Sequence, residues 1–293
     1  MNSILNGVKK EAVPPKKLQE KKQRVVKIAC DLVGECIEKY PQVVGFELGG
    51  SYAKGTWVPE KPVDNVDIDI FVKFNKKTSE KDFRNIGTEI GFQSLKKYKP
   101  YTRHAEHPFV EAIIDGTRVN VVPCYDVNKG EWKSATDRSI YHTKFMLQKL
   151  SNSMKGDVRI LKKFLQHIEV YGAEIAKEGF SGYVTEALIF YFGSFEKTIK
   201  KISELKKGQV IGKSTKKFDS FVVIIDPIDN NRNLGTAISI ENLGKFVLAS
   251  RAFLRNPSKN FFKKPISKRI MRNTDKIIVV QFKVKERSDD IVW

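Results

Sequence analysis

Two aspartates, Asp67 and Asp69, are the residues of this chain best placed for chemistry, because they lie two apart in the apolar run 66–71 (VDIDIF). A strand has a period of two residues, so both carboxylates project from one face while Ile68 and Ile70 face the other. Two negative charges fixed on a rigid strand suit a divalent cation. Asp-x-Asp on an exposed edge strand is also common without any function, so the pair needs support from its surroundings.

A glycine turn upstream gives that support. Ser51 stands sixteen residues before Asp67 and directly follows Gly49 and Gly50. Glycines let the backbone approach a ligand closely, and the exposed N–H groups of such a turn suit a phosphate. The turn and the carboxylates together indicate a site for a metal-bound nucleotide.

The elements around these motifs predict a first half that mixes helices with a sheet. Residues 16–39 carry apolar side chains near helical spacing and end at Tyr40-Pro41, which predicts an amphipathic helix, and a second helix is expected over 80–98. Asp115-Gly116, between two apolar runs, predicts a tight hairpin. The expected strands are 43–48, 66–74, 109–114 and 118–122.

The second half, from about residue 140, is predominantly helical in pattern. Val158, Leu161, Leu165 and Ile168 form one apolar stripe, and residues 183–202 predict another helix, whose aromatic residues are expected to be buried. The other expected elements are a strand over 221–225, a helix over 240–253 and a strand over 276–284, which needs a pairing partner. The fold class predicted from these elements is α+β with a mixed sheet.

The net charge of +19 is concentrated in three segments. Residues 1–24 carry seven Lys/Arg against two Glu, residues 196–217 eight against two, and residues 251–276 nine against one, which accounts for the whole excess. Positive charge grouped this densely favours a polyanionic partner, most often a nucleic acid held through its phosphates. A lysine-rich, merely solvated surface is the alternative.

Composition points to a globular chain with about two domains. Its hydrophobic fraction is 41%, and no run approaches the roughly eighteen apolar residues of a membrane span. The N-terminus lacks the apolar core of a signal peptide, so a cytoplasmic location without membrane contact is expected. Cys30, Cys36 and Cys124 have neither CxxC nor histidine spacing, and we expect reduced, mostly buried thiols.

Collinear motifs make the chain resemble the archaeal CCA-adding enzymes, the class I tRNA nucleotidyltransferases. The resemblance covers about residues 15–290, and each block is weak alone whereas the ordered set is strong. The blocks are 49–57 (GGSYAKGTW) with 66–69 (VDID), 104–108 (HAEHP), 121–125 (VVPCY), 159–162 (RILK), 171–174 (YGAE), 179–183 (GFSGY), and Asp226-Pro227 with Arg232-Asn233.

The resemblance implies a polymerase-β-like nucleotidyltransferase head over residues 1–145 and a helical domain like that of poly(A) polymerases over 146–260. Residues 261–293 would begin a body domain. The implied reaction is stepwise, template-independent addition of C, C and A to the tRNA 3′ end from CTP and ATP, with two Mg²⁺ ions as cofactors.

The same resemblance implies roles for individual positions. Asp67 and Asp69 would bind the metal, while Gly50 and Ser51 would cradle the β and γ phosphates with Lys54 close by. His142, Lys162 and Tyr171 match positions that contact the triphosphate and sugar, and Arg232 matches a base-reading arginine. Without the resemblance, Lys162 would count as solvated, His142 and Tyr171 as structural, and Arg232 equally as a phosphate contact.

Asn120 departs from the family, which has a third catalytic carboxylate at this position. An asparagine can offer a carbonyl oxygen to a metal, but it carries no charge and accepts no proton. The chain would then be an engineered trap, a decayed enzyme, or one that recruits another carboxylate such as Glu106 or Asp64. Asn120→Asp is predicted to raise CMP incorporation; no gain would mean that a substitute ligand already acts or that the site is dead.

Length is the second departure, because the family continues beyond 276–284 into the rest of a body domain and a tail that grips the tRNA elbow. Either the chain is truncated, or a second chain or a homodimer completes the body. The expectation is reduced tRNA affinity, with the acceptor end held by the basic segments 196–217 and 251–276. Equal binding of full-length tRNA and an acceptor minihelix would support this.

Two other functions remain open. Another template-free nucleotidyltransferase, such as a poly(A) polymerase or an oligoadenylate synthetase, shares the Gly-Ser turn and Asp-x-Asp, and would yield ATP-only products. A non-catalytic tRNA-binding protein fits Asn120 and the positive charge, and would bind tRNA without metal-dependent turnover.

Overall fold

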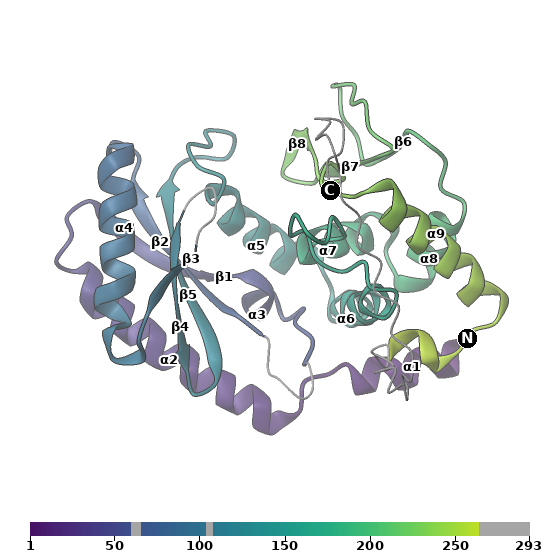
Figure 1. Cartoon of the computed structure of the whole chain (residues 1–293), viewed down its shortest axis with the longest axis horizontal. Helices are drawn as coiled ribbons and strands as arrows, with labels where there is room; N and C mark the ends of the chain where they lie inside the picture. Colours follow the sequence, from purple (N-terminus) through teal and green to yellow (C-terminus); the bar gives the residue numbers. More distant parts are fainter. Residues whose placement is uncertain (60–65, 104–107, 264–293) are drawn as a thin grey trace, which may run out of the picture.

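A five-stranded mixed sheet forms one body of the molecule, and a mostly helical body lies beside it (Figure 1). The computed structural model describes residues 1–59, 66–103 and 108–263. The strand order of the sheet is β1-β2-β5-β4-β3. Its strands are β1 (Val43–Gly49), β2 (Ile68–Asn75), β3 (Tyr101–Arg103), β4 (Phe109–Ile114) and β5 (Thr117–Asp126).

The central strands β2 and β5 run parallel, whereas the other neighbouring strands are antiparallel. This confirms the predicted mixed sheet. The hairpin between β4 and β5 is also confirmed, since Asp115 and Gly116 both have the positive φ angles, 46° and 67°, of a tight hairpin turn.

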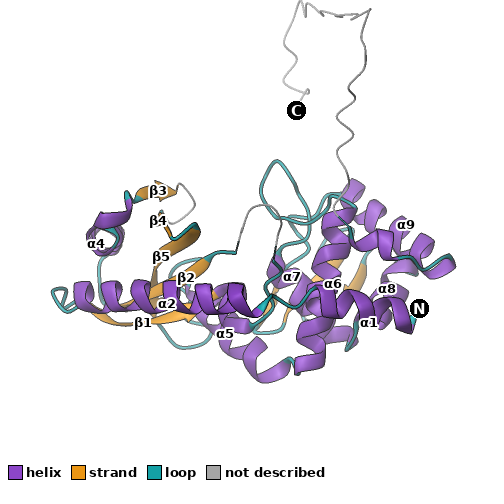
Figure 2. Ribbon diagram, turned by 90° about the horizontal axis from the view of Figure 1, so that it is seen from below, coloured by secondary structure: helices purple, strands orange, loops and turns teal. Residues whose placement is uncertain are grey.

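Helices α2 (Lys16–Ile37) and α4 (Glu80–Ser94) contact each other and contribute to the core of this body. Ile68 and Ile70 are fully buried in that core, as the alternating pattern of β2 predicts. Between the sheet and the helical body lie α3 (Gly50–Lys54) and α5 (Asp137–Lys149) (Figure 1), and Figure 2 again shows α5 between the two bodies. The short η1 (Lys96–Tyr98) follows α4 in the chain.

Phe164 lies at the centre of the second core, where it packs against Phe195, Phe246, Phe253 and Phe261. Apolar residues of α1 join this core although α1 opens the chain. Its helices are α1 (Asn2–Glu11), α6 (Asn152–His167), α7 (Gly182–Phe192), α8 (Phe195–Ser203), α9 (Ile240–Arg255) and η2 (Lys259–Phe262), and its small sheet has β6 (Gln209–Ile211), β7 (Val222–Asp226) and β8 (Asp229–Asn233).

The single helix predicted over 183–202 was wrong, because the segment forms two helices, α7 and α8. Gly193 has a φ of 84°, a left-handed conformation that ends α7, and the Ser194 side chain accepts a hydrogen bond from the Lys197 N–H to cap α8. The continuous apolar pattern concealed this break. The short α1, α3 and β3 were not predicted either.

Several expectations fall outside the described residues, namely the strand over 276–284 and the substitute carboxylates Glu106 and Asp64. The domain boundaries, with a head over 1–145 and a helical domain over 146–260, remain a prediction. Helix α1 lies within the predicted head in sequence, but it packs against the helical body. The three cysteines are free thiols, two of them buried, as expected. In the described ranges no helix is both long and apolar enough to cross a membrane.

Candidate active site

The two aspartates and the end of the glycine turn meet at the start of β2. Asp69 is paired in register with Gly49 of β1 and Asn120 of β5, and Asp67 stands directly before the strand. Asn120 Nδ2 donates a hydrogen bond of 2.8 Å to Asp69 Oδ1, and Arg118 Nε lies 2.7 Å from Asp67 Oδ1. The Asp67–Arg118 and Asp69–Asn120 contacts are two residues apart along the strands, on either side of the Ile68–Val119 pair. Because side chains alternate with a period of two, both carboxylates face the same side of the sheet.

The electrostatics of this pair suit a cation. Burial raises the pKa of Asp67 to about 6; the nearby charge of Asp69 also raises it, while Arg118 lowers it. The pKa of Asp69 is raised as well, mainly by burial, although the Asn120 hydrogen bond opposes the shift. A positive ion placed between the carboxylates would relieve this cost of ionisation.

Gly50 is required by the position of Asp69. It has a φ of 68°, and a Cβ atom at this position would overlap Asp69 Oδ2. Only glycine combines this left-handed backbone with so close an approach. The short helix α3 starts here, so Ser51 follows the carboxylate contact directly and Lys54 ends the same helix.

Lys54 and Lys162 approach one buried glutamate, Glu186 of α7. Lys54 Nζ donates to Glu186 Oε2 at 2.6 Å, and Thr56 Oγ1 donates to Glu186 Oε1. Lys162 Nζ lies 3.9 Å from Oε1 and donates a hydrogen bond to the Thr56 carbonyl oxygen. Burial lowers the pKa of Lys162 to about 8, even though Glu186 raises it. Burial raises the pKa of Glu186, but both lysines outweigh this and the net shift is downward. Two cations against one anion give this buried cluster a positive excess.

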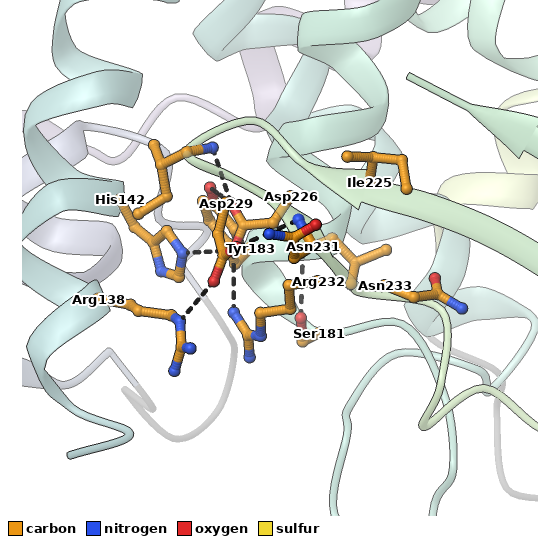
Figure 3. Close-up of polar contacts among 12 residues, drawn as sticks. Arg138, His142, Ser181, Tyr183, Ile225, Asp226, Asp229, Asn231, Arg232 and Asn233 are labelled. Atoms are coloured by element: carbon orange, nitrogen blue, oxygen red, sulfur yellow. Dashed lines mark hydrogen bonds and ion pairs between the residues drawn. The ribbon is translucent and has the colours of Figure 1, made fainter. Parts of the chain in front are cut away.

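Asp226, at the end of β7, is the centre of a second cluster (Figure 3). Its Oδ2 accepts hydrogen bonds from His142 Nε2 at 2.9 Å and Arg232 Nη1 at 3.0 Å, and its Oδ1 accepts from Tyr183 Oη and the Ile228 N–H. The His142 and Tyr183 rings stack with centroids 3.7 Å apart. One fully buried carboxylate thus orients side chains from α5, α7 and β8.

The protonation states in this second cluster follow from burial. Burial lowers the pKa of His142, and its hydrogen bond to Asp226 opposes that shift only in part. Burial raises the pKa of Asp226, but donors including His142 and Tyr183 outweigh it and hold the carboxyl below its usual range. The carboxylate is therefore ionised at neutral pH, and His142 donates Nε2–H as a neutral imidazole.

A cavity of about 740 Å³ adjoins this cluster, between α5, the start of α7 and β8. His142, Tyr183 and Arg232 line it, together with Arg138, whose Nε lies 3.2 Å from Asp229 Oδ2. Figure 3 shows that Arg138, from α5, and Arg232, from β8, reach this cavity from different elements. A pocket with two guanidinium groups and an aromatic ring can accept a planar, polar and anionic ligand.

Lys54 lies between the aspartate pair at the start of β2 and the cluster around Asp226. Its Nζ lies 5.6 Å from the centre of the Tyr183 ring, and its charge lowers the pKa of both Asp69 and His142. The Tyr171 hydroxyl and Lys162 Nζ both lie close to Gly182, the first residue of α7. A Cβ atom added at Gly182 would be 3.1 Å from the hydroxyl and 3.7 Å from Nζ.

The predicted site residues therefore gather in adjoining places. Asp67, Asp69, Asn120, Gly50 and Ser51 lie at the start of β2; Lys54, Lys162 and Tyr171 lie at Glu186 and the start of α7; His142 and Arg232 line the cavity.

Sequence reasoning missed three residues that organise these places, Asp226, Tyr183 and Glu186. Glu186 had a detectable signal, since it is the sole charged residue in the apolar run 182–192, and a buried carboxylate needs partners. Asp226 and Tyr183 stood in motifs that carried the family resemblance, but their contacts come from elements distant in sequence.

The polar atoms around Asp67 and Asp69 show whether this part of the site can hold a metal ion. Asn120 Oδ1 is buried and has no hydrogen-bond partner among the described residues, and an unpaired buried oxygen is costly unless a ligand satisfies it. Together with the Asp67 and Asp69 carboxylates it forms an all-oxygen donor set, which suits a hard divalent cation. No cluster of three or more His, Cys, Asp or Glu arranged for metal binding occurs within the described ranges, consistent with an amide at position 120.

Two protein families match successive parts of the chain. Residues 29–142 match the nucleotidyltransferase domain, and residues 156–263 match the second domain of tRNA nucleotidyltransferases.

Solved structures of similar fold include a poly(U) polymerase, Cid1, with Mg and 3′-dATP bound. That comparison has a TM-score of 0.65 at 13% identity and covers 89% of this chain and 98% of the other. The E. coli MS115-1 protein CdnC with ATP gives a TM-score of 0.62 at 16% identity and covers 89% of this chain and 94% of the other. At such identities these likenesses show the fold, and the predicted α+β nucleotidyltransferase fold is confirmed.

Relatives at higher identity include several proteins named CCA-adding enzyme. Those of Pyrobaculum islandicum and Methanocaldococcus jannaschii are 35% identical over the whole of this chain, which spans 69% and 68% of their lengths. That of Picrophilus torridus is 37% identical over 83% of this chain and 56% of its own length. The chain therefore belongs to the archaeal CCA-adding enzyme family of tRNA nucleotidyltransferases.

Proposed function

We propose that this chain adds C, C and A to the 3′ end of tRNA from CTP and ATP without a template. The chain spans only part of its relatives' lengths, so their named activity is inferred for it through its own site. The observation that carries the proposal is the continuity from the Asp67–Asp69 pair through Lys54 to the cavity beside Arg232. This continuity matches a nucleotide with its phosphates at the carboxylates and its base in the cavity.

The proposed reaction joins the tRNA 3′ oxygen to the α-phosphorus of the incoming nucleotide and breaks the α–β phosphoanhydride bond. Pyrophosphate leaves, and the hydroxyl proton passes to solvent. Enzymes of this fold generally use divalent metal ions, and we assign Mg²⁺ here, which lowers the pKa of the attacking hydroxyl and neutralises the leaving pyrophosphate when bound. Asp67, Asp69 and the amide oxygen of Asn120 are the residues that would hold it.

The lysine cluster has the charge needed to hold a triphosphate. Lys54 and Lys162 exceed the charge of Glu186 by one positive unit in a water-poor setting, where attraction to phosphate is strong. Glu186 also fixes both ammonium groups in place before substrate arrives. The Gly50–Ser51 turn, which lies against Asp69, is assigned to the phosphates on the other side.

Base recognition is assigned to the cavity. Asp226 holds the guanidinium of Arg232 through one nitrogen, Nη1, which leaves the other donors of the fork available. A planar fork can donate two parallel hydrogen bonds to acceptors on a cytosine or adenine edge. His142, stacked on Tyr183, is assigned to the sugar and phosphates.

The tRNA partner is supported by the basic segment 196–217. All eight of its lysines are exposed, on α8 and on both sides of β6, where they can meet phosphates. Of the second basic segment, 251–276, only the part up to residue 263 lies within the described residues. A cytoplasmic location and the head and helical domains with the boundaries 1–145 and 146–260 remain part of this proposal.

A tRNA that lacks its CCA end provides the test. The chain is incubated with this tRNA, Mg²⁺ and each nucleotide separately, then with CTP and ATP together, and the products are resolved by length. The proposal expects two additions with CTP alone and a third with both nucleotides. Products from ATP alone would indicate a poly(A)-type enzyme, and binding without extension would indicate a non-catalytic tRNA-binding protein.

A further inference from the structure

A row of three polar side chains crosses the middle of the sheet. Asp69 of β2 is in register with Asn120 of β5, and Asn120 is in register with Glu111 of β4. Residues in register on neighbouring strands project from the same face, and the strands lie about 4.8 Å apart. Glu111 therefore stands on the side of Asn120 opposite to Asp69.

Glu111 is an unusual residue for this position. It is 4% exposed, on a strand whose other buried residues include Val110, Ala112 and Ile114. Carboxylates are rarely buried unless they are paired. Within the described residues its polar contacts are a hydrogen bond from the Tyr101 hydroxyl and a distance of 4.0 Å between Oε2 and Arg103 Nε. Both partners lie on the exposed edge strand β3, so neither is a buried cation that would explain the carboxylate.

An unsatisfied atom lies between the two carboxylates of the row. Asn120 is 6% exposed, and its Nδ2 is used by Asp69 while its Oδ1 has no partner among the described residues. A cation bound over the middle of the row would satisfy this oxygen. The amide oxygen is thus an independent sign of a ligand at the middle strand of the row, between Asp69 and Glu111.

The charge balance favours the same conclusion. Arg118, which lies 2.7 Å from Asp67, offsets one of the two negative charges of Asp67 and Asp69. Without a further carboxylate the site would keep about one negative charge, which is weak for a divalent cation. Glu111 adds one, and a glutamate is one methylene longer than an aspartate, which extends its reach toward the middle strand.

We propose that Glu111 supplies the third carboxylate of the metal site, in place of the group that Asn120 lacks. The inference rests on the proposed function for the presence of a metal at Asp69. In the metal-free arrangement Glu111 accepts the Tyr101 hydrogen bond and does not form a ready-made metal-binding group with Asp67 and Asp69. On metal binding its side chain must turn toward Asn120 and exchange the Tyr101 hydroxyl for the cation. Tyr101 is 42% exposed, so its hydroxyl can turn to water at little cost.

The test measures Mn²⁺ binding to the full chain by electron paramagnetic resonance, without nucleotide. Glu111→Gln is expected to weaken Mn²⁺ binding by at least about tenfold, the order of loss found when supporting groups of metal sites are removed. Adding Asn120→Asp to Glu111→Gln restores a third carboxylate and is expected to recover most of the affinity. Glu47→Gln, on the same sheet but held by Lys73 and Lys144, is the matched control and leaves binding unchanged.

Tyr101→Phe separates a metal ligand from a structural role. It removes the competing hydrogen bond, so Mn²⁺ binding is expected to stay equal or tighten. Unchanged binding by Glu111→Gln would overturn the inference, and so would a loss that Asn120→Asp does not restore. If circular dichroism shows that Glu111→Gln is unfolded, Glu111→Asp, which keeps the charge but shortens the reach, is read by the same criteria.

The same preparations distinguish this inference from the proposed function. Wild-type protein that binds Mn²⁺ through Glu111 but never extends tRNA would reject the function and keep the metal site. Wild-type protein that extends tRNA while Glu111→Gln binds Mn²⁺ normally would reject only the role of Glu111. Because Glu111 already acts in the wild type, Asn120→Asp alone is expected to raise CMP incorporation by less than about tenfold, below the usual effect of restoring a missing electrostatic group.

Discussion

Asn120 Nδ2 donates a hydrogen bond of 2.8 Å to Asp69 Oδ1, at a position where the family resemblance implies a carboxylate. The amide therefore replaces a repulsion between two carboxylates with an attraction. This makes the metal-free site more stable than a site with an aspartate at position 120, and it makes the protein less dependent on a cation for its folding.

Asn120→Asp is therefore expected to destabilise the metal-free protein. The change removes a hydrogen bond and places two carboxylates in register, at a cost of about 1–3 kcal/mol. Urea unfolding in EDTA measures the loss, and added Mg²⁺ should recover it. Asn120→Ala, which loses the hydrogen bond without adding charge, should not be recovered by Mg²⁺. Equal stability of wild type and Asn120→Asp in EDTA would contradict this account of the pair.

The strands around the aspartates were predictable because β2 and β5 carry strong period-two or continuous apolar patterns, and Asp115-Gly116 has few conformations other than a tight turn. The break at Gly193 was not, because the apolar pattern is continuous through it. Helix α1 was not predicted because its apolar residues pack against the helical body, and no local sequence pattern reveals that contact.

The residues of the candidate site divide in the same way, into those that local sequence patterns predict and those that depend on distant contacts. Asp67, Asp69 and Gly50 stand on neighbouring elements and could be read from spacing. Asp226 and Glu186 act through partners more than eighty residues away, such as His142 and Lys54, and only the folded chain brings these together.

Gly50→Ala tests the contact between the turn and the carboxylate. The added methyl group overlaps Asp69 Oδ2 at a left-handed φ, so either the turn or the carboxylate must move. We expect a stability loss of about 1–3 kcal/mol, and CMP incorporation should fall by at least about 10²-fold, since small displacements at a reacting centre are that costly. Thermal unfolding and a primer-extension assay measure the two effects.

Gly244→Ala is the control for Gly50→Ala. It lies within α9, where an added methyl group meets nothing within 4 Å. Its activity should be that of the wild type, and its stability equal or slightly higher. Wild-type activity in Gly50→Ala would show that the turn does not contact the reacting group.

Arg232→Lys tests base recognition in the cavity. The substitution keeps the positive charge beside Asp226 but loses the planar fork, which costs about 1.5–3 kcal/mol of binding if the fork contacts the base. KM for CTP and ATP is expected to rise by at least about tenfold. Arg251→Lys, on the exposed face of α9, should leave KM unchanged. An unaltered KM in Arg232→Lys would remove this arginine from the nucleotide site.

Lys162 makes a prediction about pH. Burial lowers its folded-state pKa to about 8, whereas the unfolded value is about 10.4. The unfolded chain therefore holds the proton between these values, and stability rises with pH across that window. Relative to Lys162→Met, the wild type should gain on the order of 2 kcal/mol between about pH 7.5 and pH 9.5.

Urea unfolding at both pH values measures this gain, and the exposed Lys201→Met is the control for nonspecific charge effects. A difference between wild type and Lys162→Met that does not change with pH would mean that Lys162 keeps an ordinary pKa. Bound triphosphate should abolish the dependence, because an anion beside the ammonium group favours its charged form.

CMP addition to a tRNA lacking its CCA end, compared between wild type and Asp69→Asn under single-turnover conditions with Mg²⁺, tests the central claim most directly. We predict that the wild type adds two CMP residues and that Asp69→Asn is slower by at least about 10³-fold while still binding CTP in the cavity. Equal rates for the two proteins would contradict the claim that the carboxylate pair at the start of β2 is the site of the chemistry.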